Sequence, residues 1–340
     1  MRARTRALVP ILLDNLIWVL LFLTVVAFSL LAGRFLTVEN LLNILVHSAV
    51  LGIMVIGQSF TLVTGNFDLS AESNIGLIAV IGAFLLTASG EPSNGSGLML
   101  NPVLTILVML GLGFLIGEIN GLLITRMKMN NFVVTLSMMI IVRGLAFLVT
   151  QGKTVTNLPA SFKLLGNGSL GPVPISVIVV FVAFLLASVL TRHTRFGRNL
   201  YAVGGNRDAA LASGIDPDRR IRQAYLISGA LAAFAAWIEL GRLGVGATRI
   251  GEGMIFEVQA AAVIGGISLF GGRGTMIGAL GGVLLLSSIN SGLNLMRVSG
   301  FAIDMVRGVV ILAAMLIDAQ KARYKAPAGG IVRSPSGGKA

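Results

Sequence analysis

The residues of this sequence that could do chemistry are a few ionisable side chains set inside long apolar stretches. Arg143, Asp304 and Arg307 lie within such stretches, and Asp304 and Arg307 are three residues apart, which brings two side chains together on one helix face. A charge in the hydrocarbon of a membrane is costly, so it normally faces a partner or a wet cavity. Two interpretations stay open here, a structural ion pair or a gate in a polar pathway. Glu118 and Glu239 allow the same two.

A second group of polar residues follows the apolar stretch that ends near residue 64. Asp68, Ser70, Glu72 and Asn74 lie there within ten residues, and we expect them to line or gate a pathway near its cytoplasmic exit. The alternative is a solvated turn. The full set of pathway candidates is Asp68, Ser70, Glu72, Asn74, Asn120, Arg143, Asn290, Asp304 and Arg307.

Catalytic and metal-binding clusters are not expected. The chain has no cysteine and only two histidines, His47 and His193, which excludes thiol chemistry, thiolate metal sites and a multi-histidine centre. The carboxylates are scattered along the sequence. Aromatic residues make up 6%, too few for a platform that stacks single-stranded nucleic acid. The chain is therefore not expected to be an enzyme or to hold a metal or cofactor.

The elements that must position these residues are membrane helices. Of 340 residues, 55% are hydrophobic and 12% charged, and the mean hydropathy is +0.89; a soluble domain carries about 25% charged residues. The apolar stretches are continuous, which favours helices over the alternation of a β-barrel. We predict an all-α polytopic membrane protein of about ten helices, with the third and eighth short and broken or re-entrant. The segments are 15–33, 42–64, 74–89, 102–124, 132–150, 174–191, 223–241, 254–269, 275–293 and 301–317.

The basic residues predict the orientation. Eighteen Lys and Arg fall in loops on the side of the N-terminus and six on the other, a bias typical of the cytoplasmic face. It places both termini in the cytoplasm of a bacterial inner membrane and explains the net charge of +12 without nucleic acid. The expected parts are a cytoplasmic segment 1–14, a transmembrane domain 15–318 and a tail 319–340 with the composition of disordered chain.

Glycines recur every four residues in two of the predicted helices. The two series are Gly113, Gly117 and Gly121, and Gly274, Gly278 and Gly282. Small residues at this spacing let another helix pack closely, and such faces also slide at little steric cost during a conformational change.

The two glycine series also indicate an internal repeat. Ile-Asn pairs at 119–120 and 289–290, and Val-Arg-Gly at 142–144 and 306–308, recur at an offset of five helices. Because the offset is an odd number of helices, the second copy would cross the membrane in the opposite direction to the first. We therefore predict a five-helix inverted repeat, a common transporter plan. A competing alignment pairs Gly65–Leu86 with Gly265–Leu286.

The segment 192–222 carries seven arginines and falls on the predicted cytoplasmic side. Asn206 suits an N-cap, Asp208 the first turn and Gly214 a C-terminal cap, which predicts a helix of about two turns. A helix this short needs a partner surface to persist. The alternative is a solvated basic loop. The docking candidates are Asn206, Arg207, Asp208, Ala209, Ala210, Gly214 and Ile215.

Asp208-Ala209-Ala210 followed by Gly214 resembles the Glu-Ala-Ala-x-x-x-Gly element of ATP-binding cassette importer permeases. The run Gly265–Thr275 resembles their ribose/xylose-type branch without departure, as do Asn120–Leu123, Phe132, Thr135-Leu136 and Arg143-Gly144. The resemblance covers residues 15–320. One departure concerns the common Gly-Gly-x-Asp-Leu-Ser-Val-Gly-Ser: at 65–73 Asp68, Leu69, Ser70 and Ser73 remain, but two glycines are lost and Glu72 is gained, which bears on pentose specificity.

The resemblance implies a machine of several chains. Two permease copies or homologues pair, two cytoplasmic ATPases hold ATP and magnesium and receive the 206–215 helix, and a periplasmic binding protein delivers a sugar or sugar-like solute (a pentose, hexose or polyol) for alternating access. The alternative function is an ion-coupled secondary transporter or channel without an ATPase, which would cluster titratable residues near the midplane and need no docking helix. A membrane enzyme is a third possible class, but the sequence lacks the cluster of His, Cys or carboxylate residues that such an enzyme would need.

Overall fold

The computed structural model describes residues 16–303, 305–306, 308–309 and 312. In that part of the chain, six helices are long and apolar enough to cross a membrane: α3 (Val38–Val63), α5 (Pro102–Thr125), α6 (Asn131–Thr150), α8 (Ile175–His193), α11 (Pro217–Leu243) and α13 (Met276–Leu295). Three shorter apolar helices are α2 (Leu16–Leu31), α4 (Ala71–Leu86) and α12 (Met254–Ile264).

Nine of the ten predicted segments coincide with these helices, and the third and eighth, α4 and α12, are indeed short. The tenth, 301–317, lies largely outside the described residues, as do 1–14 and 319–340. The count of ten helices and the inverted repeat therefore stay predictions.

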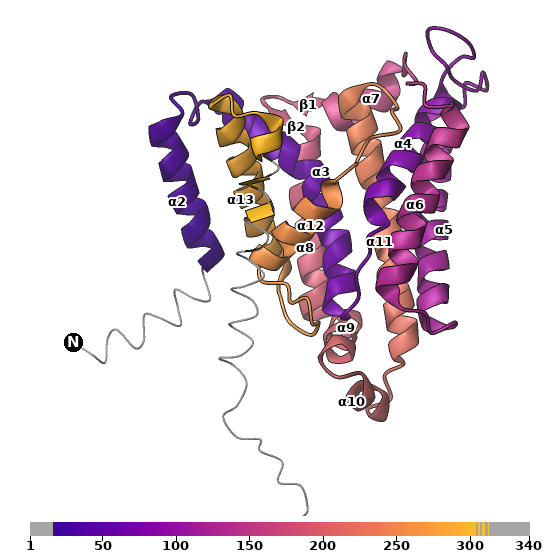
Figure 1. Ribbon diagram of the computed structural model, residues 1–340, viewed down its shortest axis with the longest axis vertical. Helices are drawn as coiled ribbons and strands as arrows, with labels where there is room; N and C mark the ends of the chain where they lie inside the picture. The colour runs from indigo at the N-terminus through magenta and orange to yellow at the C-terminus, as the bar shows by residue number, and fades with distance from the viewer. Residues whose placement is uncertain (1–15, 304, 307, 310–311, 313–340) are drawn as a thin grey trace, which may run out of the picture.

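The remaining elements lie at the two ends of the molecule. α9 (Arg195–Gly205) and α10 (Arg207–Ala212) lie at one end, and α7 (Ala160–Asn167) lies at the other with a hairpin in which β1 (Ser169–Leu170) pairs antiparallel with β2 (Val173–Pro174) (Figure 1).

Side-chain caps set where several helices begin. The carboxamide oxygen of Asn101 accepts a hydrogen bond from Val103 N at 2.8 Å, and Pro102 occupies the first helical position of α5, where its missing N–H costs nothing. Thr275 Oγ1 caps α13 in the same way by accepting from Gly278 N at 3.0 Å. These starts follow from local sequence.

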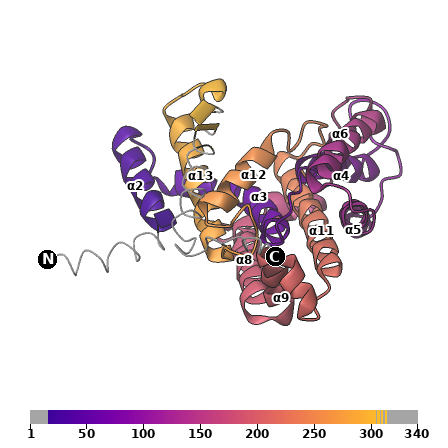
Figure 2. The ribbon, with the colours of Figure 1, turned by 60° about the horizontal axis from the view of Figure 1, so that its bottom comes forward.

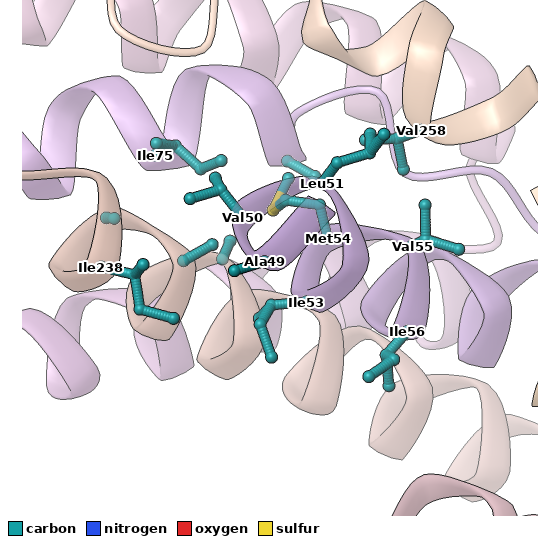
Figure 3. Close-up of a cluster of buried hydrophobic side chains, with 14 of the residues drawn as sticks. Ala49, Val50, Leu51, Ile53, Met54, Val55, Ile56, Ile75, Ile238 and Val258 are labelled. Atoms are coloured by element: carbon teal, nitrogen blue, oxygen red, sulfur yellow. The ribbon is translucent and has the colours of Figure 1, made fainter. Parts of the chain in front are cut away.

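The core surrounds α3. Every residue from Ser48 to Val63 is buried, and a helix buried on all faces is apolar all round. Figure 3 shows Ile53, Val55 and Ile56 pointing from α3 in different directions, with Ile75, Ile238 and Val258 of neighbouring helices around it. α4, α5 and α6 form one side of the molecule, and α2 and α13 the other (Figures 1 and 2).

Both glycine series lie at helix contacts. On α5, a Cβ atom added at Gly113 would lie 2.8 Å from Ala233 Cβ, and one at Gly121 would lie 3.1 Å from Arg222 Cα. Gly117 between them faces the backbone of Tyr225. The absence of side chains on this face therefore lets α5 and α11 touch backbone to backbone.

The second series brings α13 against the end of α12. A Cβ atom at Gly282 would lie 3.1 Å from Gly265 N, and one at Gly278 would lie 3.3 Å from Gly265 C. Gly274 precedes the helix with φ +130°, a conformation that other residues rarely adopt.

Candidate functional site

A buried polar network surrounds the linker between α3 and α4. Ser70 Oγ donates to Asp68 Oδ1 at 2.6 Å, and Ser228 Oγ of α11 donates to Asp68 Oδ2 at 2.7 Å. Asn120 Nδ2 of α5 donates to Ser70 Oγ at 2.8 Å, and Asn74 Nδ2 lies 3.4 Å from the same oxygen. Hydrogen bonds to a charged acceptor are roughly twice as strong as neutral ones, so Asp68 ties α11 to the linker.

This network corrects the interpretation of residues 68–74 as a solvated turn. Asp68, Ser70, Asn74 and Asn120 are all 0% exposed. A role for them in lining or gating a pathway stays a prediction. Their arrangement joins α4, α5 and α11 at one point. Ser228 was missed by the sequence analysis, since a single serine in an apolar helix carries no local signal.

Several polar atoms of the network have no hydrogen-bond partner within the described chain. Ser73 Oγ, Asn74 Oδ1 and Asn120 Oδ1 are among them, and so are both amide atoms of Gln58 on α3. Buried polar atoms without partners are uncommon and destabilising.

Glu72, in the first turn of α4, and Arg143 of α6 form a second polar site. Arg143 Nη2 lies 3.7 Å from Glu72 Oε1. Arg143 Nη1 donates to the carbonyls of Thr248 at 2.6 Å and Ile250 at 3.0 Å, and Ile255 N donates to Glu72 Oε2 at 3.3 Å. The pair therefore fastens the segment between α11 and α12 to α4 and α6.

That segment, residues 244–253, reaches deep into the helical layer. Arg143 lies seven residues before Thr150, the end of α6, or roughly 10 Å at 1.5 Å per residue. Because Thr248 and Ile250 bind Arg143, the segment lies beside the interior of a spanning helix, and α12 starts at mid-height (Figure 1). The sequence analysis ended one apolar segment at 241 and began the next at 254, and it did not predict that the residues between them enter the helical layer.

The other pathway candidates have different surroundings. Asn290 Nδ2 on α13 lies 3.5 Å from Glu257 Oε1 on α12, away from the Asp68 network. Asp304 and Arg307 lie outside the described residues. Glu239 pairs with Arg242 at 2.7 Å and Glu118 pairs with Arg222, so both carboxylates have structural ion partners.

The irregular segment 265–275, after α12, extends toward α9. Gly272 N donates to Val63 O at 2.9 Å at the end of α3, and Tyr201 Oη of α9 donates to Gly274 O at 2.9 Å. Burial raises the pKa of Tyr201, which keeps its hydroxyl protonated as a donor. The glycine-rich run therefore joins α3 to the end of the molecule that carries α9 and α10.

α10 is the exposed helix of the segment 192–222. Asn206 Oδ1 accepts from Ala209 N at 2.9 Å, and Gly214 has φ +78°, so both ends carry the caps expected from their residue types. The segment is not a loop, and α9 precedes it as a further helix that the sequence analysis did not predict.

The direction in which Ala210 faces differs from the expectation. Ala210 is 3% exposed and packs with Ile124, Val134 and Tyr225, whereas Leu211 is 62% exposed. The outward face of α10 carries Arg207, Asp208, Ala209, Leu211 and Ala212. Ala210 is therefore an interior contact of this chain, and Leu211, which the sequence analysis left out, is the large apolar side chain on the surface.

Asp218, at the start of α11, forms ion pairs with residues of two neighbouring elements. Its carboxylate pairs with Arg207 of α10 at 2.5 Å and with Lys128 in the loop between α5 and α6. Exposed ion pairs contribute little to stability, so α10 is held mainly by the buried contacts of Ala210. Within the described residues, no group of three or more His, Cys, Asp or Glu could hold a metal ion.

Comparison with known proteins shows which family the chain is similar to. The family model "Branched-chain amino acid transport system / permease component" matches residues 40–315. The chain is 38% identical over 303 residues to the ribose import permease of Bacillus subtilis (strain 168), covering 88% of this chain and 91% of the relative.

Two further relatives show the same extent of similarity. The galactose/methyl galactoside import permease of Escherichia coli (strain K12) is 34% identical over 84% of this chain and 88% of its own length. The L-arabinose ABC transporter permease of Azospirillum brasilense is 34% identical over 93% and 91%. No solved structure matches significantly.

Proposed function

Since the chain belongs to the branched-chain amino acid transport system / permease component family, we propose that it is the membrane-spanning subunit of an ATP-binding cassette importer for a sugar. The resemblance to importer permeases is thereby confirmed at the level of the family. Relatives that cover nearly the whole chain are named for ribose, galactose and arabinose, which supports a neutral monosaccharide as the solute.

The observation that carries the proposal is the outward face of α10. A six-residue helix is too short to persist alone, and here it is capped at both ends, packed inward through Ala210 and exposed outward through Leu211. Leu211 lies there beside the exposed Ala209 and Ala212, so the outward face of α10 offers a small apolar surface next to Arg207 and Asp208 for a partner protein. The proposed partner is a cytoplasmic ATPase that holds ATP and magnesium, whereas this chain supplies the pathway.

Further partners follow from the same proposal. A second permease copy or homologue would complete the pathway, and a periplasmic sugar-binding protein would dock at the end of the molecule that carries α7. Both termini would lie in the cytoplasm. The interrupted helices α4 and α12 would supply the change of packing that alternating access needs, because irregular backbone at membrane depth lies where a transporter opens.

Reconstitution tests the proposal against the ion-coupled alternative. The chain is co-expressed with an ATPase and a binding protein encoded beside it, purified and placed in proteoliposomes, and uptake of radiolabelled ribose, galactose and arabinose is measured. We expect uptake that requires ATP hydrolysis and the loaded binding protein. Uptake that follows a proton or sodium gradient in the absence of ATP would establish a secondary transporter instead.

A further inference from the structure

Charged side chains are exposed at membrane depth beside the start of α12. The guanidinium of Arg249 lies 3.7 Å from Glu252 Oε2, with the side chains 79% and 59% exposed. Arg249 lies between Thr248 and Ile250, whose carbonyls bind Arg143 inside α6. A charged pair at this depth does not face lipid, because exposed charge in hydrocarbon is strongly unfavourable.

The same surface continues along α12. On α12, Phe256 is 62% exposed and Gln259 is half-buried three residues further, so these two share one helix face, and Glu252 lies in the turn just before the helix. The opposite face packs into the core through Ile255 and Val258. The exposed face of α12 and the turn before it therefore present an aromatic ring, an amide and an acid.

We propose that Arg249, Glu252, Phe256 and Gln259 form a sugar-contact site in the translocation pathway; this rests on the proposed function. A monosaccharide offers hydroxyl groups that both donate and accept, and an apolar ring face. Glu252 accepts, Arg249 donates and Gln259 does both, while Phe256 supplies a flat apolar surface. Small-molecule sites combine apolar area with a few placed polar groups in this way.

The charges of the site favour a neutral solute. Arg143 and Arg249 carry two positive charges, and Glu72 and Glu252 carry two negative ones. Arg143 already binds Glu72 and backbone carbonyls. Arg249 and Glu252 contact each other at a long distance, so this pair can separate and bind a solute. Because carboxylates and guanidinium groups both lie here, the site suits the hydroxyl groups of a neutral solute, which donate and accept hydrogen bonds.

Cysteine accessibility tests the site without any transport assay, and the natural chain has no cysteine. Phe256→Cys and Gln259→Cys are made, with Leu115→Cys as matched control because Leu115 is 54% exposed on the spanning helix α5. The chain, with its co-purified subunits, is placed in lipid nanodiscs and treated with a charged methanethiosulfonate. We expect labelling at 256 and 259 and none at 115. Absence of labelling at 256, or a disulfide between two Phe256→Cys copies, would overturn the site.

A transport assay then tests whether the site contacts the sugar. In the reconstituted complex, with the sugar that the wild type imports, Glu252→Ala should lower uptake about tenfold, the effect of one lost hydrogen bond to a charged group. Phe256→Leu, which loses the flat aromatic surface, should lower uptake as well. Phe256→Tyr, which keeps the aromatic ring, should restore uptake. Normal uptake in Glu252→Ala and Phe256→Leu would overturn the sugar contact. If the wild type imports none of the sugars, the proposed function fails, whereas the labelling result stands by itself.

Discussion

Glu72 caps a helix through a residue that lies 183 positions later in the chain. Its Oε2 accepts a hydrogen bond from Ile255 N at 3.3 Å in the first turn of α12. The residue at the N-cap position, Gly253, has no side chain and adopts φ +77°, so the helix does not cap itself. A carboxylate at a helix N-terminus also interacts favourably with the helix dipole, and Glu72 supplies it from α4.

Removal of this cap should destabilise the protein. Glu72→Ala loses the hydrogen bond to Ile255 and leaves Arg143 without its carboxylate, at a cost of about 2 kcal/mol. Thermal unfolding in detergent measures the effect. The control is Glu91→Gln, whose side chain lies on the surface. An unfolding temperature of Glu72→Ala equal to that of this control would contradict the capping role.

Ser228 and Asp68 should be energetically coupled. Loss of the hydroxyl in Ser228→Ala removes a hydrogen bond to a carboxylate, worth about 1.5–3 kcal/mol. Ser176→Ala is the matched control, because Ser176 is also buried but its hydroxyl has no partner within the described chain. A double-mutant cycle with Asp68→Asn measures the coupling, and additive effects would show that the bond contributes nothing.

The small face of α5 should tolerate no side chain where it meets α11. Gly117→Ala places a methyl group against the backbone of Tyr225 and should cost about 1–3 kcal/mol by overpacking. Gly111→Ala on the same helix meets nothing within 4 Å and should be neutral or slightly stabilising. The comparison is made by thermal unfolding, and equal behaviour of the two variants would show that α5 and α11 are not in close contact.

Leu211 should decide whether the ATPase is retained. Burial of a leucine contributes about 1.5–3 kcal/mol, so Leu211→Asp should lower the amount of co-purified ATPase at least tenfold while the chain accumulates normally. Leu170→Asp, equally exposed at the opposite end of the molecule, serves as control and should retain the ATPase. Full retention by Leu211→Asp would rule out the outward face of α10 as the docking surface. Ala210→Trp is not a useful probe, because it overpacks the interior.

The orientation is tested by labelling intact cells. Leu98→Cys lies in the exposed segment after α4, and Arg198→Cys lies on α9 at the other end. A thiol reagent that does not cross membranes should label the first and not the second if both termini are cytoplasmic. The opposite pattern would reverse the topology.

The amino-acid sequence determined the features of this protein that depend on neighbouring residues. Continuous apolar stretches place the helices, because backbone groups in a membrane must be satisfied within one segment. Asn206 and Gly214 define the ends of the exposed segment that includes α10, because caps act on the adjacent turn. The glycine spacing on α5 marks a contact face without naming the partner helix.

Tertiary structure alone decided which residues meet. Ala210 and Leu211 are adjacent in sequence, yet one is buried and the other exposed, because only the packing of α10 on α11 and the end of α5 selects the inward face. Glu72 reaches Ile255, and Arg143 draws the segment 244–253 into the helical layer, through contacts between segments about 70 to 180 residues apart. Helical periodicity specifies a face and leaves open what packs against it, so these pairings follow from the fold of the whole chain.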